Sequence, residues 1–505
     1  MDSIFSDVIK PINITLKSFS RLSPRNSKLE NILLDILHMD NSFNMTRFDD
    51  PIQESIADFS TRIVNRNLSS EVIKEAKYRV LDSLAVSIAS LRLKPIRILR
   101  SGFIGVYPID MGSTIWFTDF KTIPESAAFV NGSMIRALDF NDTYLSKEPL
   151  HPSDMIASLY AANEYSTLDG MDLIRGLVVG YEVGIRLCDS GSIRVRGWDH
   201  VNYTMIGAVA GLGNMLELSY EEVGEALSIA VVPHIALRQT RAGKIKMWKA
   251  SAASNACRHA LYAVYLASIG YEGPHQPFIG DMGFIKQLGV EFDTTPIEEL
   301  RDLKDPKAIL KSYMKFHPVE YHAQSAVDAI YSLLDRYSFT YKDVESIEVG
   351  TVKATYDIIV KHPEKWAPDT RETADHSLPY IVAHTLRYGD IWIDSFDEDR
   401  LQDRDVMGLM KRMKIYVDEE LNRRYPEEVP NKIVVKLRDG SRYEETVFRP
   451  RGYPGSGYNV EKLLLEKVRR LMNPFYPEER VEEIINYVLN LENNSLYELS
   501  ELLVI

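Results

Sequence analysis

Apolar residues recur at three- and four-residue spacing through the first half of the chain, which is the spacing of one face of a helix. The stretches IQESIADFSTRIVNR, from Ile52, and SSEVIKEAKYRVLDSLAVSIASL, from Ser69, both follow it. Ser69 and Ser70 with Glu71 make a suitable helix start. The same spacing continues over residues 154–166, 171–188, 201–218, 221–232 and 250–269. Because strand signals are scarce before Gly270, we expect an all-helical domain here.

The pattern changes after Gly270. The loop YEGPHQPFIGDMGF leads into shorter elements and β-branched runs such as VESIEVGTVKAT. MKIYVDEEL and NKIVVKLRDGSRYEETVF alternate as strands do, with Asp439 and Gly440 at a hairpin turn. After the Gly/Pro loop RPRGYPGSGYN, VEKLLLEKVRRLM and ERVEEIINYVLNLE return to helical spacing. We predict a mainly α protein: an all-helical domain of residues 46–270 and 456–505, and a smaller α+β domain of residues 271–455.

The first 45 residues differ from the rest of the chain. They show weak periodicity and no domain-like core, and Met45 stands just before the first well-patterned helix. We expect residues 1–45 to be a dispensable N-terminal extension, or the product of a start codon placed too early. Mass spectrometry of the native protein would decide between these two.

Composition restricts the classes of function. The chain has 505 residues, 45% hydrophobic and 26% charged, enough for a large core. Its net charge of -13 disfavours general attraction to nucleic acid or to an anionic membrane surface. With only Cys188 and Cys257, a disulfide framework, a multi-thiolate zinc site and an iron–sulfur cluster held by three or four cysteines are excluded. Because no signal-peptide core or membrane-length apolar run is evident, we expect a cytoplasmic protein.

One window concentrates positive charge in this acidic chain. Arg238 to Lys249, RQTRAGKIKMWK, holds five cations and no acid. The small residues that follow, SAASNACRHALYAV, permit close helix packing, so Lys249 could lie near a buried helix start. A polycarboxylate would suit such a cluster through charge-assisted hydrogen bonds. A solvated basic loop explains this window equally well.

A second window, RALDFNDTYLSKEPLHPSD, crowds polar side chains into residues 136–154. Pro152 fits the first position of a helix, so His151 would lie at the helix N-terminus, where the dipole keeps an imidazole neutral and able to act as a base. As a metal site the window is weak, since it has neither calcium-loop spacing nor HExxH. A capped, hydrogen-bonded turn is the alternative.

Other polar residues precede helices later in the chain. His200 stands before the long helical stretch VNYTMIGAVAGLGNML, whose glycines do not form GxGxxG and indicate helix packing. Taken singly, such a His more often caps or packs. Two junctions in the α+β part could project groups into a cleft, although helix capping explains each of them. They carry Lys315, His317 and His322, and Arg371, His376, Ser377 and Tyr380.

Taken together, ALDFNDTYL with HPSD, WDHVNYT, QTRAGKIKMWKASAASNACR, FHPVEYHAQ and TRETADHSLPY resemble the MmgE/PrpD family, in order, from about Ile52 to the C-terminal Gly/Pro loop. The resemblance implies a large all-helical domain with a smaller α+β lid domain, a homodimer, and a cleft site that uses no metal or other cofactor. Carried over motif by motif, it implies the site residues Asp139, Thr143, His151, His200, Lys249, Lys315, His322, His376 and Tyr380.

Within that family the wording of TRETADHSLPY and MWKASAASNA is most like 2-methylcitrate dehydratase. The resemblance implies a small tricarboxylate as the partner. We expect His151 to act as the base and His200 or Tyr380 as the acid, or the two roles to be exchanged. Lys249, Lys315 and Arg238 would hold the carboxylates. Two alternatives keep the same residues: decarboxylation of cis-aconitate or epimerisation of an iminodisuccinate-like acid, and non-catalytic binding of a tricarboxylate.

Overall fold

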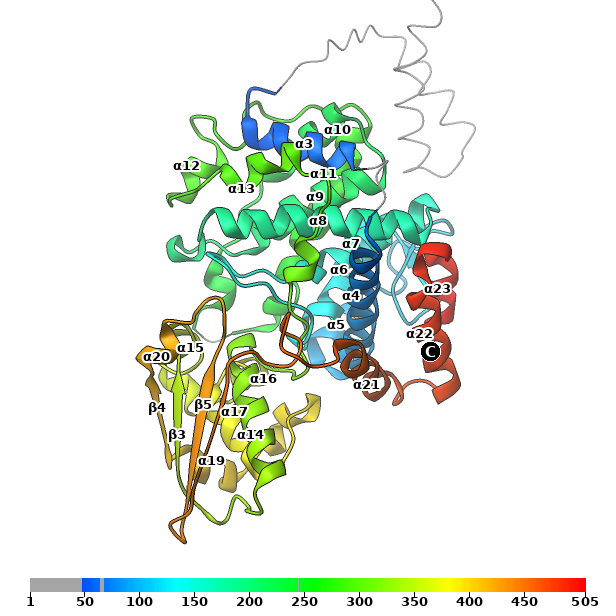
Figure 1. The fold of residues 1–505 in the computed structure, drawn as a ribbon. Coiled ribbons are helices and arrows are strands. Elements are labelled where there is room, and N and C mark those ends of the chain that lie inside the picture. The colour runs from blue at the N-terminus through cyan, green and yellow to red at the C-terminus, as the bar shows by residue number, and fades with distance from the viewer. Residues whose placement is uncertain (1–47, 64–67, 244) are drawn as a thin grey trace, which may run out of the picture.

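The computed structural model describes residues 48–63, 68–243 and 245–505, and helices predominate in it (Figure 1). A mainly α protein with small sheets is therefore confirmed. The expected extension of residues 1–45 lies outside the described residues. Within the described ranges, no helix is both long enough and apolar enough to span a bilayer.

The predicted helices form in the first part of the chain, and side-chain caps begin several of them. Ser69 accepts from the Val72 amide at the start of α4, as its place in the sequence predicts. Ser219 and Glu222 form a reciprocal capping box at the start of α10. The helices are α3 (Pro51–Arg62), α4 (Ser70–Ala89), α5 (Lys94–Phe103), α6 (Pro124–Arg136), α7 (Ile156–Ser166), α8 (Gly170–Ser190), α9 (Val201–Met215), α10 (Tyr220–Val231), α11 (Ala252–Ser268), α12 (Phe284–Leu288) and α13 (Thr295–Glu298), with a short hairpin of β1 (Ser113–Thr114) and β2 (Lys121–Thr122) before α6.

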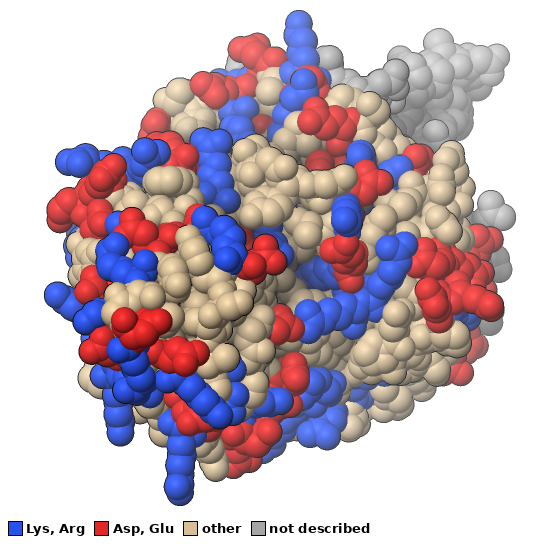
Figure 2. All heavy atoms as spheres, turned by 60° about the horizontal axis from the view of Figure 1, so that its bottom comes forward, with Lys and Arg blue, Asp and Glu red and all other residues tan. Residues whose placement is uncertain are grey.

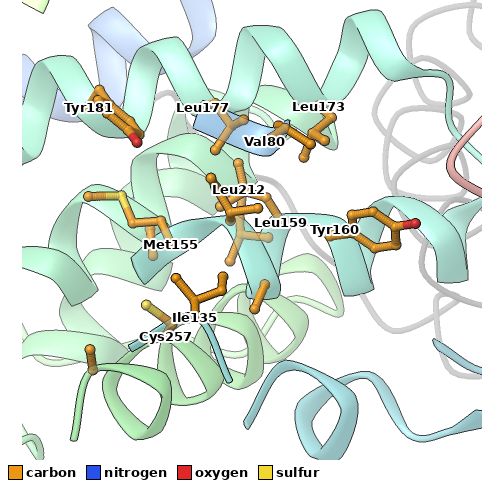
Figure 3. Packing of buried hydrophobic residues seen from close by; sticks show 14 of the residues in the cluster. Val80, Ile135, Met155, Leu159, Tyr160, Leu173, Leu177, Tyr181, Leu212 and Cys257 are labelled. Carbon is orange, nitrogen blue, oxygen red and sulfur yellow. The ribbon is translucent and has the colours of Figure 1, made fainter. Parts of the chain in front are cut away.

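One large hydrophobic core joins these helices. Figure 3 shows part of it, where Leu159 of α7, Leu177 of α8 and Leu212 of α9 meet. The C-terminal helices α21 (Val460–Met472), α22 (Glu478–Leu489) and α23 (Leu496–Leu502) bury apolar side chains in the same core, beside α4 in Figure 1. Residues 278–316 also contribute to it, on the far side of the predicted boundary at residue 270. The domain boundaries themselves stay a prediction.

Glycines allow α8 and α9 to cross closely. A Cβ added at Gly211 would lie 2.5 Å from the carbonyl oxygen of Gly176, and one at Gly207 would lie 2.7 Å from that of Gly180. Real side chains cannot approach a carbonyl that closely. The glycines of the VNYTMIGAVAGLGNML stretch are therefore packing residues, as the sequence indicates.

The remaining part of the chain forms a four-stranded sheet covered by helices, at the lower left of Figure 1. Its strand order is β4-β3-β5-β6, with β3 parallel to β4 and antiparallel to β5. The predicted hairpin joins β5 to β6 through Gly440, which has φ 91°. The strands are β3 (Val344–Thr351), β4 (Met413–Val417), β5 (Asn431–Leu437) and β6 (Arg442–Val447), and the helices are α14 (Gln324–Arg336), α15 (Lys353–Ile359), α16 (Arg371–Ala374), α17 (Leu378–Tyr388), α18 (Glu398–Leu401), α19 (Arg404–Met410) and α20 (Glu419–Asn422).

A second hydrophobic core fills the space between this sheet and its helices. Val349 of β3 and Val435 of β5 are fully buried in it together with Ile330 of α14 and Ile381 of α17. On the face of the molecule drawn in Figure 2, Lys and Arg side chains are interspersed with Asp and Glu side chains. A polyanion would meet no single-signed surface on that face.

Candidate active site

Side chains from both parts of the chain line a cavity of about 440 Å³. Nine of the ten site residues predicted from the sequence line this cavity, although they lie far apart in the sequence. They are Asp139, Thr143, His151, His200, Arg238, Lys249, Lys315, His322 and His376.

Asp139 is in contact with three of the cations that line the cavity. It follows α6 in the left-handed region, with φ 50°, which Asp tolerates better than most residues. Its Oδ1 lies 2.8 Å from Arg136 Nη1 and 2.7 Å from Lys315 Nζ, and its Oδ2 lies 3.0 Å from Lys249 Nζ. Burial alone would raise the pKa of Asp139, but these three cations hold that pKa well below its usual value. The carboxylate is ionised.

The cationic window divides into a buried end and an exposed part. Lys249 belongs to the 3₁₀ turn Met247–Ala250, directly before α11, and is 5% exposed, so its expected place near a buried helix start is confirmed. Arg238 is exposed although it lines the cavity, and Lys246 is exposed as well. Lys244 lies outside the described residues. The alternative of a solvated basic loop thus holds for part of the window.

His151 directly precedes the 3₁₀ turn Pro152–Met155 that leads into α7. Its Nδ1 lies 2.8 Å from the carbonyl oxygen of Asp142 and 2.7 Å from Thr143 Oγ1. Since a carbonyl only accepts, Nδ1 carries the proton, and Nε2 accepts from Arg136 Nη2 at 3.0 Å. Burial, and then Arg136, lower the pKa of His151 well below its usual value. The ring is neutral as expected, but burial and a nearby cation are the main causes, rather than the helix end.

His200 directly precedes α9 and faces His151, with 5.5 Å between the ring centroids. Asp199 Oδ1 lies 3.4 Å from its Nδ1, and Arg241 Nη2 lies 3.4 Å from its Nε2. Burial, and then Arg241, lower the pKa of His200 to about 3, while Asp199 opposes the shift. Two neutral imidazoles therefore adjoin the same cavity.

His376 connects the sheet-containing part to Asp139. Its Nε2 lies 3.2 Å from Asp139 Oδ2, and its Nδ1 lies 2.5 Å from Asp375 Oδ1. These three residues are close enough together to ligate a metal ion. However, Lys249 Nζ lies 3.0 Å from Asp139 Oδ2, 3.8 Å from Asp375 Oδ1 and 3.3 Å from both ring nitrogens of His376. The ammonium supplies the positive charge that a metal would bring, so the group fits a lysine better than a metal ion.

His322 forms a separate pair with Glu320 at the same cavity. Its Nδ1 lies 2.8 Å from Glu320 Oε1, and its Nε2 lies 3.4 Å from the Tyr425 hydroxyl. Burial would raise the pKa of Glu320, but His322 is the first of the groups that lower that pKa to about 2. Tyr321, between them in sequence, lines the cavity with a buried hydroxyl that has no hydrogen-bond partner among the described residues.

Tyr380 is the selected residue that does not reach the cavity. It lies in α17, 1% exposed, and packs in the second core. Its hydroxyl donates to the carbonyl oxygen of Ser395 at 2.6 Å. Because α17 begins at Leu378, the motif TRETADHSLPY presents His376 to the cavity and turns Tyr380 toward the core. The structure gives no support to Tyr380 as a proton donor.

Sequence reasoning missed several charged residues of the cavity. Arg136 opens the RALDFND window and Asp199 adjoins His200, so the polar density of these motifs was an available signal for both. Arg241 stands inside the cationic window, and its Nε lies 3.1 Å from Asp199 Oδ2. Lys365 had no such signal, because the exposed stretch around it has the ordinary composition of a loop.

Lys467 of α21 lies behind the cavity and holds two of its segments. Its Nζ donates to the carbonyl oxygens of Phe140 and Lys315, both at 2.8 Å. The same atom lies 2.6 Å from Asp82 Oδ1, and both side chains are 2% exposed. Helix α21 thereby fixes the segment that carries Asp139 against the segment that carries Lys315.

Comparisons with known proteins agree with these motifs. The MmgE/PrpD N-terminal domain matches residues 54–296, and the MmgE/PrpD C-terminal domain matches residues 317–493. A 2-methylcitrate dehydratase of Escherichia coli K12 is 26% identical over 470 residues, covering 86% of this chain and 93% of the relative. A mitochondrial 2-methylcitrate dehydratase of Yarrowia lipolytica is 27% identical over 500 residues, 94% of this chain and 93% of the relative. A cis-aconitate decarboxylase-like protein, oryM, of Aspergillus oryzae is 25% identical over 482 residues, 90% of this chain and 96% of the relative.

Proposed function

Since the chain belongs to the MmgE/PrpD family, we propose that it is a hydro-lyase that removes water from 2-methylcitrate to give 2-methyl-cis-aconitate, a step of propionate catabolism through the methylcitrate cycle. One observation carries the proposal: two neutral imidazoles, of His151 and His200, adjoin a cavity whose walls also carry Arg136, Lys249 and Lys315. The names of the relatives, 2-methylcitrate dehydratases, support this choice of substrate.

The reaction needs two positioned groups. A proton must leave a carbon next to an ionised carboxylate, while the hydroxyl group departs with a second proton. The electron pair of the broken C–H bond becomes the new double bond, and the C–O bond breaks to release water. Each of the two proton transfers typically contributes about 10²- to 10⁴-fold in rate.

His151 is suited to be the base. Its Nδ1 proton is directed to the carbonyl of Asp142, which leaves the lone pair of Nε2 as the acceptor. That lone pair accepts from Arg136 at 3.0 Å. A substrate carboxylate would draw the guanidinium toward itself and free Nε2 to take the proton. Thr143, 2.7 Å from Nδ1, positions the ring.

His200 is suited to be the acid. A bound polycarboxylate adds negative charge to the cavity, which raises the pKa of both imidazoles. Asp199 Oδ1, 3.4 Å from Nδ1 of His200, stabilises an imidazolium there, whereas His151 meets a carbonyl and a cation instead. His200 therefore takes up a proton from solvent when the substrate binds, and it donates this proton to the departing hydroxyl group.

The cations would bind the carboxylates and stabilise the charge that develops on the carboxylate next to the reacting carbon. Preorganised cations in a buried site usually make the largest contribution of this kind. Lys249 and Lys315 are held in place by Asp139, so they need little reorganisation. We propose no metal or other cofactor, because the ammonium of Lys249 already occupies the centre of the Asp139, Asp375 and His376 group.

A second candidate reaction is decarboxylation of cis-aconitate. The Aspergillus oryzae relative named a cis-aconitate decarboxylase-like protein favours it. It would use the same binding of carboxylates and a proton transfer to carbon in place of water loss.

One assay separates the two reactions. The protein would be incubated with 2-methylcitrate, citrate or cis-aconitate while ultraviolet absorbance of the new double bond and release of carbon dioxide are followed. Dehydration raises the absorbance with 2-methylcitrate and releases no gas. Carbon dioxide from cis-aconitate would instead identify a decarboxylase, and tight binding of a tricarboxylate without turnover of any acid would identify a binding protein.

We also propose that the α+β part acts as a lid domain on an all-helical domain, since His376 of the former completes the surroundings of Asp139 of the latter. A homodimer is supported by Met247 and Trp248, two large apolar side chains that are adjacent in the chain and exposed, because exposed apolar surface marks interfaces. Light scattering on the purified protein tests the dimer, and a monomer at micromolar concentration would contradict it.

Buried free cysteines support a reducing compartment such as the cytoplasm.

A further inference from the structure

Lys365 is a buried lysine on an otherwise exposed segment. The side chains from Lys361 to Ala367 are all exposed except that of Lys365, which is 6% exposed and lines the cavity. Lysine is almost never buried unless it is paired, because desolvating an ammonium is unfavourable. The Lys365 side chain is flexible and could extend from this loop into water, yet it lies against the cavity.

The backbone around Lys365 is fixed by hydrogen bonds. Its amide donates to the carbonyl oxygen of His362 at 3.0 Å, and its own carbonyl accepts from the hydroxyl of Ser377, which caps α17. Trp366 Nε1 donates to the carbonyl oxygen of Val360 at 2.9 Å and closes the turn. Lys365 is thereby tied to the residue that follows His376 in the chain, so its position in the cavity is defined.

The ammonium of Lys365 forms no ion pair or hydrogen bond with any of the described residues, in contrast to the other buried lysines at the cavity. Lys315 lies 2.7 Å and Lys249 lies 3.0 Å from a carboxylate oxygen of Asp139. Burial lowers the pKa of Lys365, and Asp375 is the first of the carboxylates that oppose this shift from a distance. A bound anion would supply the missing partner.

We propose that Lys365 binds a carboxylate of the substrate that dicarboxylic acids lack, and that it is a specificity-determining residue for tricarboxylates. The inference rests on the proposed function, because it presupposes a polycarboxylate in the cavity. Proton transfer engages the carbon atoms that lie against His151 and His200, and the cations around Asp139 and Asp199 adjoin those rings. Lys365 stands on the wall contributed by the sheet-containing part, where the remaining carboxylate of a tricarboxylate can reach it.

The test measures binding of citrate and of glutarate by calorimetry. Citrate carries three carboxylates and glutarate two, so the difference between them reports on the extra group. Lys365→Met should weaken citrate binding about ten- to a hundredfold, the range for a hydrogen bond to a charged group, and leave glutarate binding unchanged. Lys365→Arg should retain part of the citrate affinity.

Lys361→Met is the matched control. Lys361 lies on the same segment, is exposed, and pairs with Asp357 at the surface, so its substitution should change neither affinity. Thermal unfolding checks that each variant is folded. If Lys365→Met binds citrate as the wild type does, or loses both acids equally, the inference is wrong while the proposed function stands. If the wild-type protein binds neither acid, the inference is wrong, and if it also fails to turn over 2-methylcitrate the proposed function is wrong as well.

Discussion

At the scale of single residues, neighbouring groups set the charge state of each titratable side chain in the cavity. Asp139 stays ionised because three cations surround it, and His151 stays neutral because it is buried beside a guanidinium. The charge state of each residue therefore depends on its charged neighbours. Replacing one group removes its chemistry and also changes the charge state that its neighbours prefer.

The proposed base and the central lysine give the first prediction. His151→Ala should lower kcat by about 10²- to 10⁴-fold because the proton acceptor is lost. Lys249→Ala should lower kcat by at least about 10²-fold because a preorganised cation is lost. Steady-state kinetics with 2-methylcitrate measure both, and circular dichroism shows whether the fold is kept. Near-normal turnover in either variant would remove that residue from the mechanism.

The buried imidazole of His200 gives a prediction about pH. Its pKa is about 3 in the folded protein, whereas an unfolded histidine titrates near 6.5. Below pH 6.5 the unfolded chain gains a proton that the folded chain does not, so the stability that is fully present above pH 6.5 is lost as the pH falls. Between pH 7 and pH 5 the wild type should lose about 2 kcal/mol more unfolding free energy than His200→Gln.

Urea unfolding at both pH values measures that difference. His275→Gln is the control for loss of an imidazole, because His275 is exposed. Equal slopes for His200→Gln and the wild type would show that His200 is not held neutral in the folded state.

Residue identities in the site were predictable where motifs carried a chemical signal. The polar windows led to Asp139, His151 and Lys249, which all line the cavity, and Lys249 Nζ lies 3.0 Å from Asp139 Oδ2. Lys365 could not be found in this way, because only the three-dimensional path of its loop turns it inward. Tyr380 was expected in the site because it follows His376 closely in the sequence. The sequence does not show which side of α17 faces the cavity.

At the scale of elements, the crossing of α8 and α9 depends on missing side chains. Gly211→Ala should destabilise the protein by about 1–3 kcal/mol, because the new methyl group would meet the carbonyl oxygen of Gly176 at 2.5 Å. In Gly102→Ala, at an exposed position of α5, the new methyl group meets nothing within 4 Å, so this change should be neutral or stabilising. Chemical denaturation compares the two, and equal effects would show that α8 and α9 can move apart freely.

The contact of α21 with the cavity gives another prediction. Lys467→Met should cost about 3–5 kcal/mol of stability, because it leaves Asp82 buried and unpaired. Replacing both, as Asp82→Leu with Lys467→Met, should recover much of that stability. Turnover should stay low in the double variant, since the carbonyls of Phe140 and Lys315 still lack their donor. Recovery of full kcat together with stability would show that Lys467 has no positioning role.

Helices and strands themselves were largely predictable, because their periodicity and caps are local. Ser69 and the hairpin at Gly440 lie where the sequence placed them. The packing of residues 278–316 into the first core was not evident, since these short segments have too little periodicity to show which core they join.

At the scale of the whole molecule, a ligand in the cavity should stabilise both parts of the chain at once, because Asp139 and His376 come from different parts and share the site. Citrate at 100 times its Kd should raise the unfolding free energy by about 2.7 kcal/mol and raise Tm accordingly. Scanning calorimetry with and without citrate measures this. Two separate transitions, with only one shifted by citrate, would contradict a shared site.

The mainly α class and the existence of an α+β part followed from periodicity that spans hundreds of residues. The cavity itself did not, because it is formed by loops and helix ends whose meeting depends on how two cores pack. His151 and His200 illustrate the limit: the sequence places each before a helix, and only the fold sets their rings 5.5 Å apart.

The sheet-containing part is bounded by two segments that touch. Gly452, with φ 86°, leaves no room for a Cβ beside the carbonyl oxygen of Met314 and the ring of Phe316, so the chain leaves this part where it came in. Because the two ends of this part meet, a short linker could join the flanking segments without moving them. We therefore expect that the helical part still folds when a tight turn replaces residues 317–450. We also expect new substrate preferences to arise in residues 317–450.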